Sequence, residues 1–328
     1  MLLRPRRRRD SAVAAPRIVT LTLNPALDVA TATETVRPTR KIRTTGDHID
    51  PGGGGINVAR VVHALGGNVM AVVLAGGPTG EMIGELLEEE GVPHLMLPIA
   101  GRTRITLNVV EHASGLEYRF VPEGPEVTEA ELRHALDVLE TVEGEWLVAS
   151  GSLPRRVPVD VYAQIARIAA RRGRKFVLDT SGAALRAAIG SGIDLLKPSL
   201  GELESLLGRK LLTPAQEEAQ ALALVRSGGA RMVALTLGPD GAVLANGHGV
   251  LRMRPPLSEV HSAVGAGDSF LAAMVLSLAN GDRPAEALAW AIAAGSAATT
   301  GIGTARLSRA GVDAMHRALM ALPAEWHT

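Results

Sequence analysis

The chain reads Gly265-Ala266-Gly267-Asp268-Ser269 at the start of an apolar helix, which we expect to reach about Asn280 and to stop at Gly281. Small residues allow a phosphate to approach the backbone closely, and the first N–H groups of a helix point at it without internal partners. Asp268 stands in that first turn, where a carboxylate can take a proton from an attacking hydroxyl. The stretch therefore predicts phosphoryl transfer, with a helix-capping acid after a glycine turn as the alternative.

Around this stretch, apolar runs typical of strands alternate with helical patterns. We expect strands at 17–23, 68–74, 146–149, 175–178, 195–197 and 231–235, and helices at 56–65, 81–90, 159–172 and 200–207. Repeated strand–helix units predict an α/β fold with a mostly parallel sheet covered on both faces. In such sheets ligands bind at the carboxyl ends of the strands.

Two segments break this rhythm. Residues 29–50 are rich in Thr and Val and have no helical periodicity, and residues 103–121 have the signature of a hairpin with a turn at Ala113-Ser114-Gly115. Both lie between α/β units, so we expect them to form a small separate sheet at one edge of the main sheet. Such a flap is either a lid or a dimerisation surface, because a small sheet with an apolar face is not stable when exposed.

Composition narrows the class of protein. The 328 residues favour one large domain with an appendage over two equal domains. Hydrophobic residues make up 46% of the chain and aromatic residues 2%, which predicts a core of Ala, Val and Leu and argues against base-stacking platforms for nucleic acid. The absence of cysteine excludes disulfides, iron–sulfur clusters and thiolate zinc sites, and no H-E-x-x-H motif is present.

Charge is unevenly distributed along the chain. The net charge is zero, but an arginine run at 6–9 leaves the remainder mildly acidic. We interpret residues 1–16 as a disordered basic tail, in preference to a nucleic-acid patch or a targeting segment, and residues 17–328 as the folded domain. No apolar stretch approaches the length of a membrane span, so we expect a soluble cytoplasmic protein without membrane or nucleic-acid partners.

A second glycine-rich stretch, 51–57, contains four consecutive glycines before Ile56 and Asn57. It does not fit a dinucleotide fingerprint, because we expect no strand directly before it and Val58 occupies the third glycine position. The chain also lacks a G-x-x-x-x-G-K-[ST] phosphate loop. A polyglycine turn that leads into a helix instead suits close approach of a small polar ligand, with the Asn57 amide as donor and acceptor.

Taken together, the chain resembles the ribokinase-like, PfkB-type sugar kinases. The resemblance covers nearly everything from Arg17 onward and rests on the order and spacing of 24–28, 52–60, 150–154, 197–202, 236–238 and 264–268. It implies a three-layer α/β/α sandwich with a small β-sheet lid, at about 29–50 and 103–121, that pairs two subunits into a homodimer.

Within this family, residues 51–60, 113–121 and 295–299 are most similar to the minor bacterial 6-phosphofructokinases. That similarity implies ATP-dependent phosphorylation of fructose-6-phosphate to fructose-1,6-bisphosphate. Fructose-1-phosphate and tagatose-6-phosphate kinases share most of these stretches and remain alternatives. A sugar-phosphate sensor without catalytic activity is a more distant one.

The resemblance also implies roles for individual residues. Asp268 is the expected base, and the N–H groups of Gly265, Ala266 and Gly267 are expected to hold the charge on the transferred phosphoryl group. The expected partners of the sugar hydroxyls are Asp28, Gly53, Gly54 and Asn57. The expected partners of the phosphate that the sugar already carries are Lys41, Arg43, Arg104 and Ser152.

On the nucleotide side, the resemblance assigns the ATP phosphates to Lys197, Ser199, Thr236 and Gly238. Glu202 is expected to act through water on Mg²⁺. A potassium ion is implied in the loops at 262–264 and 298–306. The sequence departs from the family pattern at Ser199, where Asn is usual, at Gly201 and at Ala263, so we expect weaker affinity for Mg²⁺ or ATP and retained activity.

Overall fold

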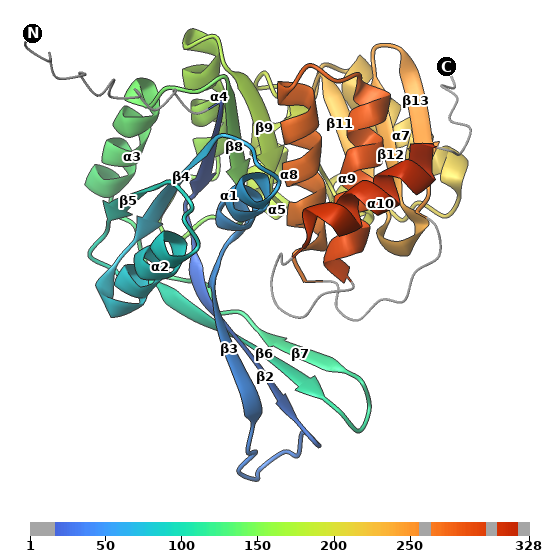
Figure 1. The fold of residues 1–328 in the computed structure, drawn as a ribbon. Coiled ribbons are helices and arrows are strands. Elements are labelled where there is room, and N and C mark those ends of the chain that lie inside the picture. The colour runs from blue at the N-terminus through green and yellow to red at the C-terminus, as the bar shows by residue number, and fades with distance from the viewer. Residues whose placement is uncertain (1–16, 256–263, 300–306, 321–328) are drawn as a thin grey trace, which may run out of the picture.

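The computed structural model describes residues 17–255, 264–299 and 307–320, and it consists of a layered body from which a small sheet projects (Figure 1). The main sheet has nine strands in the order β13-β12-β11-β10-β9-β8-β1-β4-β5. Their bounds are β1 Ile18–Thr22, β4 Val69–Ala75, β5 His94–Pro98, β8 Trp146–Ser150, β9 Lys175–Asp179, β10 Leu195–Leu196, β11 Met232–Thr236, β12 Ala242–Asn246 and β13 Gly249–Met253. The pairs from β5 to β11 are parallel, which confirms the predicted mostly parallel sheet, and β12 and β13 add an antiparallel end.

Helices cover both faces of this sheet. One face packs against α1 (Gly54–Ala64), α2 (Gly77–Glu89), α8 (Ala266–Ala279), α9 (Pro284–Thr299) and α10 (Arg309–Met320). The other face packs against α3 (Glu129–Thr141), α4 (Val161–Arg171), α5 (Gly182–Ala188), α6 (Leu200–Leu207) and α7 (Pro214–Arg226). Alternate residues of β1 serve the two cores: Ile18 belongs to the first, and Val19 and Leu21 to the second. The body is therefore a three-layer α/β/α sandwich.

The core has the composition that the sequence predicted. Between α8 and α9 it is built largely of alanine, including the fully buried Ala272, Ala289 and Ala293. Small side chains allow these two helices to pack closely against each other and against the sheet. The glycine turn before α8 is thereby held on a rigid element.

A four-stranded lid projects from the body (Figure 1). It contains β2 (Ala26–Thr33), β3 (Thr45–Gly52), β6 (Arg104–Glu111) and β7 (Glu117–Phe120), in the order β3-β2-β6-β7. The pair β2–β6 is parallel, and the outer pairs are antiparallel. The predicted separate sheet is confirmed, but its first segment begins at Ala26 and is interrupted by a loop at 34–44.

Some expectations fall outside the described residues. The basic segment 1–16 is one, so its disorder stays a prediction, as does the division of the chain at residue 17. Within the described ranges, no helix has the length and apolar character needed to cross a membrane.

Candidate active site

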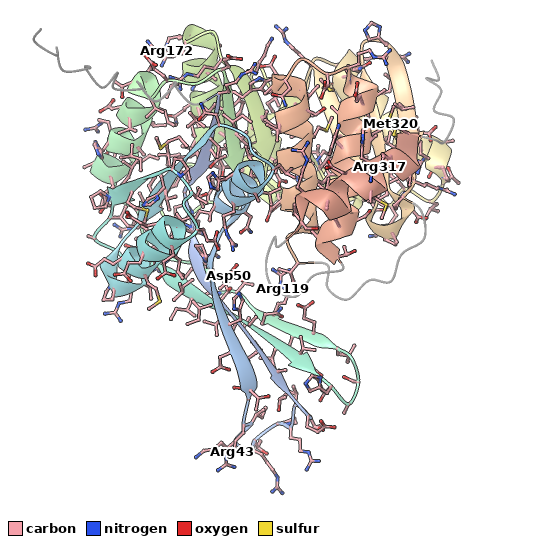
Figure 2. All side chains as sticks on the ribbon, in the orientation of Figure 1. Arg43, Asp50, Arg119, Arg172, Arg317 and Met320 are labelled. Carbon is pink, nitrogen blue, oxygen red and sulfur yellow. The ribbon has the colours of Figure 1, made fainter. Side chains whose placement is uncertain are left out.

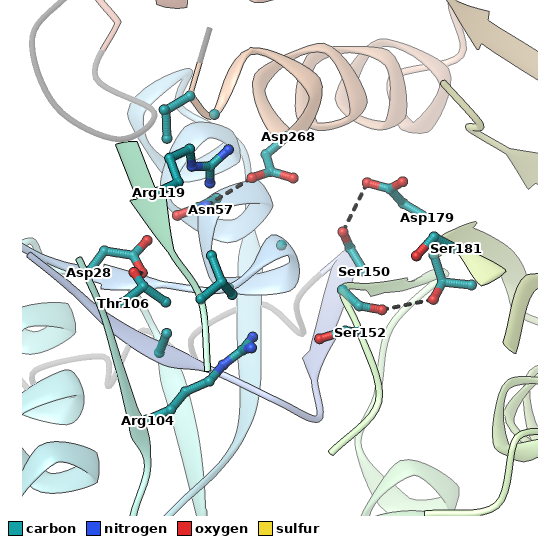
Figure 3. A pocket seen from close by; sticks show the side chains of 18 of the residues that line it. Asp28, Asn57, Arg104, Thr106, Arg119, Ser150, Ser152, Asp179, Ser181 and Asp268 are labelled. Carbon is teal, nitrogen blue, oxygen red and sulfur yellow. Dashed lines mark hydrogen bonds between the residues drawn. The ribbon is translucent and has the colours of Figure 1, made fainter. Parts of the chain in front are cut away.

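A cavity of about 290 Å³ lies where the carboxyl ends of β1, β8 and β9 meet the lid and the start of α8 (Figure 3). Its charged and amide side chains are those of Asp28, Asn57, Arg104, Arg119, Asp179, Glu202 and Asp268. Gly53, Gly54, Ser152 and Gly265 also line it. Residues from six separate parts of the sequence that were predicted to act together are thus brought into one cavity.

Asp268 lies in the first turn of α8 and is held by Asn57, whose Nδ2 donates to its Oδ2 at 2.8 Å. Burial, with the added repulsion of Asp179, raises the pKa of Asp268 to about 7, although Asn57 and Lys197 oppose the shift. A buried carboxylate with a pKa near neutrality is suited to accept a proton during a reaction. The Oδ1 of Asn57 is buried and has no hydrogen-bond partner in the described part of the chain, so it can accept from a ligand hydroxyl.

The glycine turn before Asp268 has the conformation that anion binding requires. Gly265 is the N-cap of α8 and adopts a left-handed conformation with φ 77°, which favours glycine. The N–H groups of the first helical turn have no carbonyl partner within the helix and point outward. A Cβ at Gly267 would lie 3.5 Å from the Nζ of Lys197, so this cation is next to the turn. The turn therefore has a geometry suited to an anion, and its role as an anion hole stays a prediction.

Lys197 is buried and forms an ion pair with Asp179, with 3.0 Å between Nζ and Oδ1. Burial disfavours its charge, but attraction to Asp179, with smaller contributions from Asp268 and Glu202, raises its pKa above the ordinary value. The lysine therefore remains a cation inside the site. Asp179 also accepts a hydrogen bond from the Ser150 hydroxyl at 3.1 Å (Figure 3).

The residues expected on the nucleotide side come together at the ends of the neighbouring strands β10 and β11. Ser199 forms a β-bridge with Thr236, and Gly238 begins the short 3₁₀ turn that follows. Ser199 caps α6: its Oγ accepts from the Glu202 N–H at 3.3 Å, and its own N–H donates to the Oε2 of Glu202 at 2.7 Å. Among these residues, Glu202 is the one that reaches the cavity described above.

Arg104 lines the cavity and also connects neighbouring segments of the backbone. Its guanidinium donates to three backbone carbonyls, those of Pro25 at 3.4 Å, Pro122 at 2.7 Å and Asn24 at 2.9 Å. A guanidinium has five N–H donors, so part of its capacity remains for a ligand. Ser152 lies nearby and accepts from the Asn24 side chain at 3.1 Å.

Lys41 and Arg43 do not reach the cavity. Both are exposed in the loop between β2 and β3, and Figure 2 shows Arg43 at the far end of the lid. The expectation that they meet the sugar phosphate with Arg104 is therefore wrong within one chain. The physical reason is the length of the strands, which carries this loop away from the body.

Among the cavity residues that were not identified from the sequence are Thr106, Arg119 and Asp179. Thr106 donates to Asp28 at 2.5 Å, and burial raises the pKa of Asp28 although Thr106 and Arg119 oppose it. Strand register would have indicated Thr106 and Arg119. Thr106 is the cross-strand partner of Asp28, and Arg119 is the partner of Asn108, two residues further along β6. Asp179 ends β9, and the rule that ligands bind at strand ends would have indicated it.

The donor set is compatible with Mg²⁺. The described residues contain no group of three or more side chains that could enclose a metal ion. Mg²⁺ keeps several waters and is usually bound by one or two carboxylates together with substrate phosphates, and Asp179 and Glu202 supply carboxylates on the cavity wall. The loops expected to hold potassium, 262–264 and 298–306, lie largely outside the described residues.

The fold agrees with the family comparison. The model of the pfkB family carbohydrate kinases matches residues 23–310, and the chain belongs to this family. It is thus an ATP-dependent sugar kinase. The ribokinase of Arabidopsis thaliana, solved with ribose and ATP, is 22% identical with a TM-score of 0.74 and shows the same fold.

More similar relatives are phosphofructokinases. The ATP-dependent 6-phosphofructokinase isozyme 2 of Mycobacterium tuberculosis is 44% identical over 301 residues, which cover 91% of this chain and 88% of that protein. The isozyme of Escherichia coli K12 is 43% identical over 290 residues, covering 88% and 94%. Crystal structures of E. coli phosphofructokinase-2 with potassium and with fructose-6-phosphate have TM-scores of 0.89 and 0.88 at 40% and 39% identity, and each comparison covers 93% of this chain and 99% of the other.

The raised pKa of Asp268 predicts a pH-dependent cost to stability. The folded chain keeps the proton on Asp268 up to pH about 7, whereas the unfolded chain releases it near pH 4, so stability is lost as pH rises through this window. Asp268→Asn removes the cost. The free energy of unfolding, measured in urea, is compared between the variant and the native chain at each pH. The difference in favour of the variant should be about 2 kcal/mol larger at pH 8 than at pH 5.

The matched control is Asp137→Asn, on the exposed face of α3. The free energy of unfolding of this control should differ from that of the native chain by the same amount at pH 5 and at pH 8. An equal difference for Asp268→Asn at pH 5 and pH 8 would contradict the raised pKa.

Proposed function

We propose that this chain transfers the γ-phosphoryl group of ATP to the C1 hydroxyl of fructose-6-phosphate, giving fructose-1,6-bisphosphate and ADP. The observation that carries the proposal is the buried Asp268 at the start of α8, facing a cavity that the lid closes on one side with arginines. The specific substrate is supported by the names of the relatives at 43–44% identity and by the E. coli structure with fructose-6-phosphate.

Asp268 acts as the base in this proposal. Its carboxylate takes the proton of the sugar hydroxyl while the hydroxyl oxygen bonds to the γ-phosphorus and the bond to the ADP oxygen breaks. Asn57 keeps the carboxylate turned toward the cavity through the 2.8 Å hydrogen bond. Raising the pKa of the base toward 7 makes it a stronger proton acceptor than an ordinary aspartate.

The start of α8 holds the charge that develops on the transferred group. The N–H groups of Gly265, Ala266 and Gly267 face it, and Lys197 adds a cation beside Gly267. Glu202 and Asp179 are the carboxylates on the cavity wall that would hold Mg²⁺, which would neutralise further charge on the phosphates. Ser199, Thr236 and Gly238 form the border on which the nucleotide lies.

On the lid side, Arg104, Arg119 and Ser152 bind the phosphate that the sugar carries. The side chain of Arg119 makes no hydrogen bond or ion pair with another residue of the described ranges, so its guanidinium is available to an anion. Asp28, Gly53, Gly54 and Asn57 hold the sugar hydroxyls, with Asp28 oriented by Thr106.

The test of the reaction is Asp268→Asn in a coupled assay with ATP. Because the amide cannot take the proton, kcat should fall by roughly 10²–10⁴-fold, while nucleotide binding stays close to native. The native chain is assayed with fructose-6-phosphate, fructose-1-phosphate, tagatose-6-phosphate, fructose and ribose. A near-native rate in the variant would remove Asp268 as the base, and a better substrate than fructose-6-phosphate would correct the substrate.

The lid also carries a surface that one chain leaves uncovered. Strand register places Ile49, Val29, Leu107 and Phe120 in one row across all four lid strands. Ile49, Leu107 and Phe120 are 40%, 38% and 56% exposed. The neighbouring row, with Asp28 and Thr106, faces the cavity. We infer that two lids pair through this apolar row and give a homodimer; for E. coli phosphofructokinase-2, a tetrameric inhibited form has been solved.

The pairing predicts how the assembly responds to one charge. Leu107→Glu places a carboxylate in the middle of the apolar row, so the dimer should dissociate to monomers in light scattering at micromolar concentration. The control is Leu212→Glu, since Leu212 is 82% exposed on the body. Native protein that is monomeric, or a Leu107→Glu variant with the native mass, would contradict lid pairing.

A further inference from the structure

A buried ion network joins the root of the lid to two helices of the body. The Nη2 of Arg60 on α1 lies 3.0 Å from the Oδ1 of Asp50 on β3 and 2.6 Å from the Oε1 of Glu90, which caps α2. The Nε of Arg60 donates to the other oxygen of Glu90 at 2.6 Å. The side chains of Arg60 and Asp50 are only 5% and 3% exposed. One guanidinium therefore ties β3 to α1 and α2 at the point where Figure 2 shows Asp50, at the base of the lid.

This network lies directly behind the sugar site. In the antiparallel pair β2–β3, Asp50 is the cross-strand partner of Asp28, so both carboxylates stand on the same face of the lid. Two residues further along β3, a Cβ at Gly52 would lie 2.1 Å from the Asp28 carboxylate. The backbone that Arg60 fixes thus forms part of the wall against which Asp28 rests.

The two carboxylates repel each other unless a cation stands between them. Burial raises the pKa of Asp28, and the charge of Asp50 raises it further, against Thr106, Arg119 and Arg104. Asp50 itself faces Arg60 from α1 and the Nε2 of His48 at 3.0 Å from its own strand. Glu90, from α2, faces the same guanidinium. When two carboxylates share a site without a counterion, one of them takes up a proton.

We propose that Arg60 is a positioning residue of the sugar site: its guanidinium holds Asp50 at the root of β3 and offsets the repulsion that this carboxylate exerts on Asp28, so that Asp28 stays turned toward the sugar hydroxyls. The inference rests on the proposed function, in which Asp28 binds the sugar. Arg60 itself touches neither substrate; it acts through Asp50 and the root of β3. In a purely structural role, the network would only hold the lid to the body. Removing Asp50 together with Arg60 would then not restore the sugar affinity that is lost when Arg60 alone is replaced.

A double-mutant cycle on the full chain separates these roles. The dissociation constant of fructose-6-phosphate is measured by calorimetry at pH 7 for the native chain, Asp50→Asn, Arg60→Met and Asp50→Asn/Arg60→Met. Arg60→Met removes the guanidinium that offsets Asp50, so the repulsion on Asp28 grows and the constant should rise by about tenfold. In the double variant the carboxylate charge at position 50 is removed as well, and affinity should return to within about threefold of native.

Two further measurements complete the test. The affinity loss of Arg60→Met should shrink as pH rises, because the pKa of Asp28 is already raised by burial and higher pH favours its charged form. The KM for ATP should stay native throughout. Arg133→Met is the control, since Arg133 forms an exposed pair with Glu129 on α3. If Arg60→Met does not fold, Arg60→Lys replaces it: near-native sugar affinity is expected, because the cation beside Asp50 is kept.

The outcomes distinguish this inference from the proposed function. Sugar affinity that is equally low in Arg60→Met and in the double variant, with no dependence on pH, would show that Arg60 only supports the fold. If Arg60→Lys lost sugar affinity as strongly as Arg60→Met, the charge beside Asp50 would not be what matters. That result would also show that Arg60 only supports the fold. A native chain that does not bind fructose-6-phosphate would overturn the proposed substrate and, with it, this inference.

Discussion

The structure of the site depends on one buried carboxylate, that of Asp268, held at the positive end of α8. A charge in this position is costly because burial removes it from water, and Asp179 adds repulsion. The hydrogen bond from Asn57, the nearby Lys197 and the N–H groups of the helix start offset that cost. The balance leaves a carboxyl group whose pKa is close to neutrality. These groups lie on α1, β9 and α8 and directly after β10, all of which belong to the sandwich.

The two faces of the lid differ in polarity because side chains alternate between the faces of a sheet. One face has to present polar groups to the cavity, and the other is free to be apolar. Because side chains alternate along a strand, the row with Asp28 and Thr106 and the row with Val29 and Leu107 point in opposite directions. The same four strands can therefore close the sugar site and offer a surface for a second subunit.

Much of this arrangement could be predicted from the sequence. The strand–helix alternation gave the mostly parallel sheet, and the glycine turn before Asp268 and the turn before Asn57 indicated the two helix starts that build the site. The hairpin β12–β13 was missed although Asn246-Gly247 between apolar runs is a strong hairpin signal. Lys41 and Arg43 were placed wrongly because residue type identifies a phosphate ligand but not how far a strand carries it from the body.

Contacts between distant segments were the hardest to predict. Arg104 was expected as a phosphate ligand, and its three hydrogen bonds to carbonyls of other segments could not be read from its neighbours in sequence. Asp179 and Arg119 became visible once strand order and register were known. Arg60 lies inside the stretch that carries the family resemblance, yet its bond to Asp50 needs the curvature that brings β3 over α1.

The charges of the site also explain why a phosphorylated sugar suits it better than a free one. Lys197 and the start of α8 place positive charge on the body side, and Arg104 and Arg119 place it on the lid side, with the carboxylates of Asp28 and Asp268 also lining the cavity. A neutral sugar would satisfy the carboxylates through its hydroxyls and leave the arginines of the lid without an anion. A sugar phosphate satisfies both, and repulsion between its phosphate and those of ATP favours binding them on opposite sides. In the proposed reaction, this placement of charge directs the end of the sugar opposite its phosphate toward Asp268.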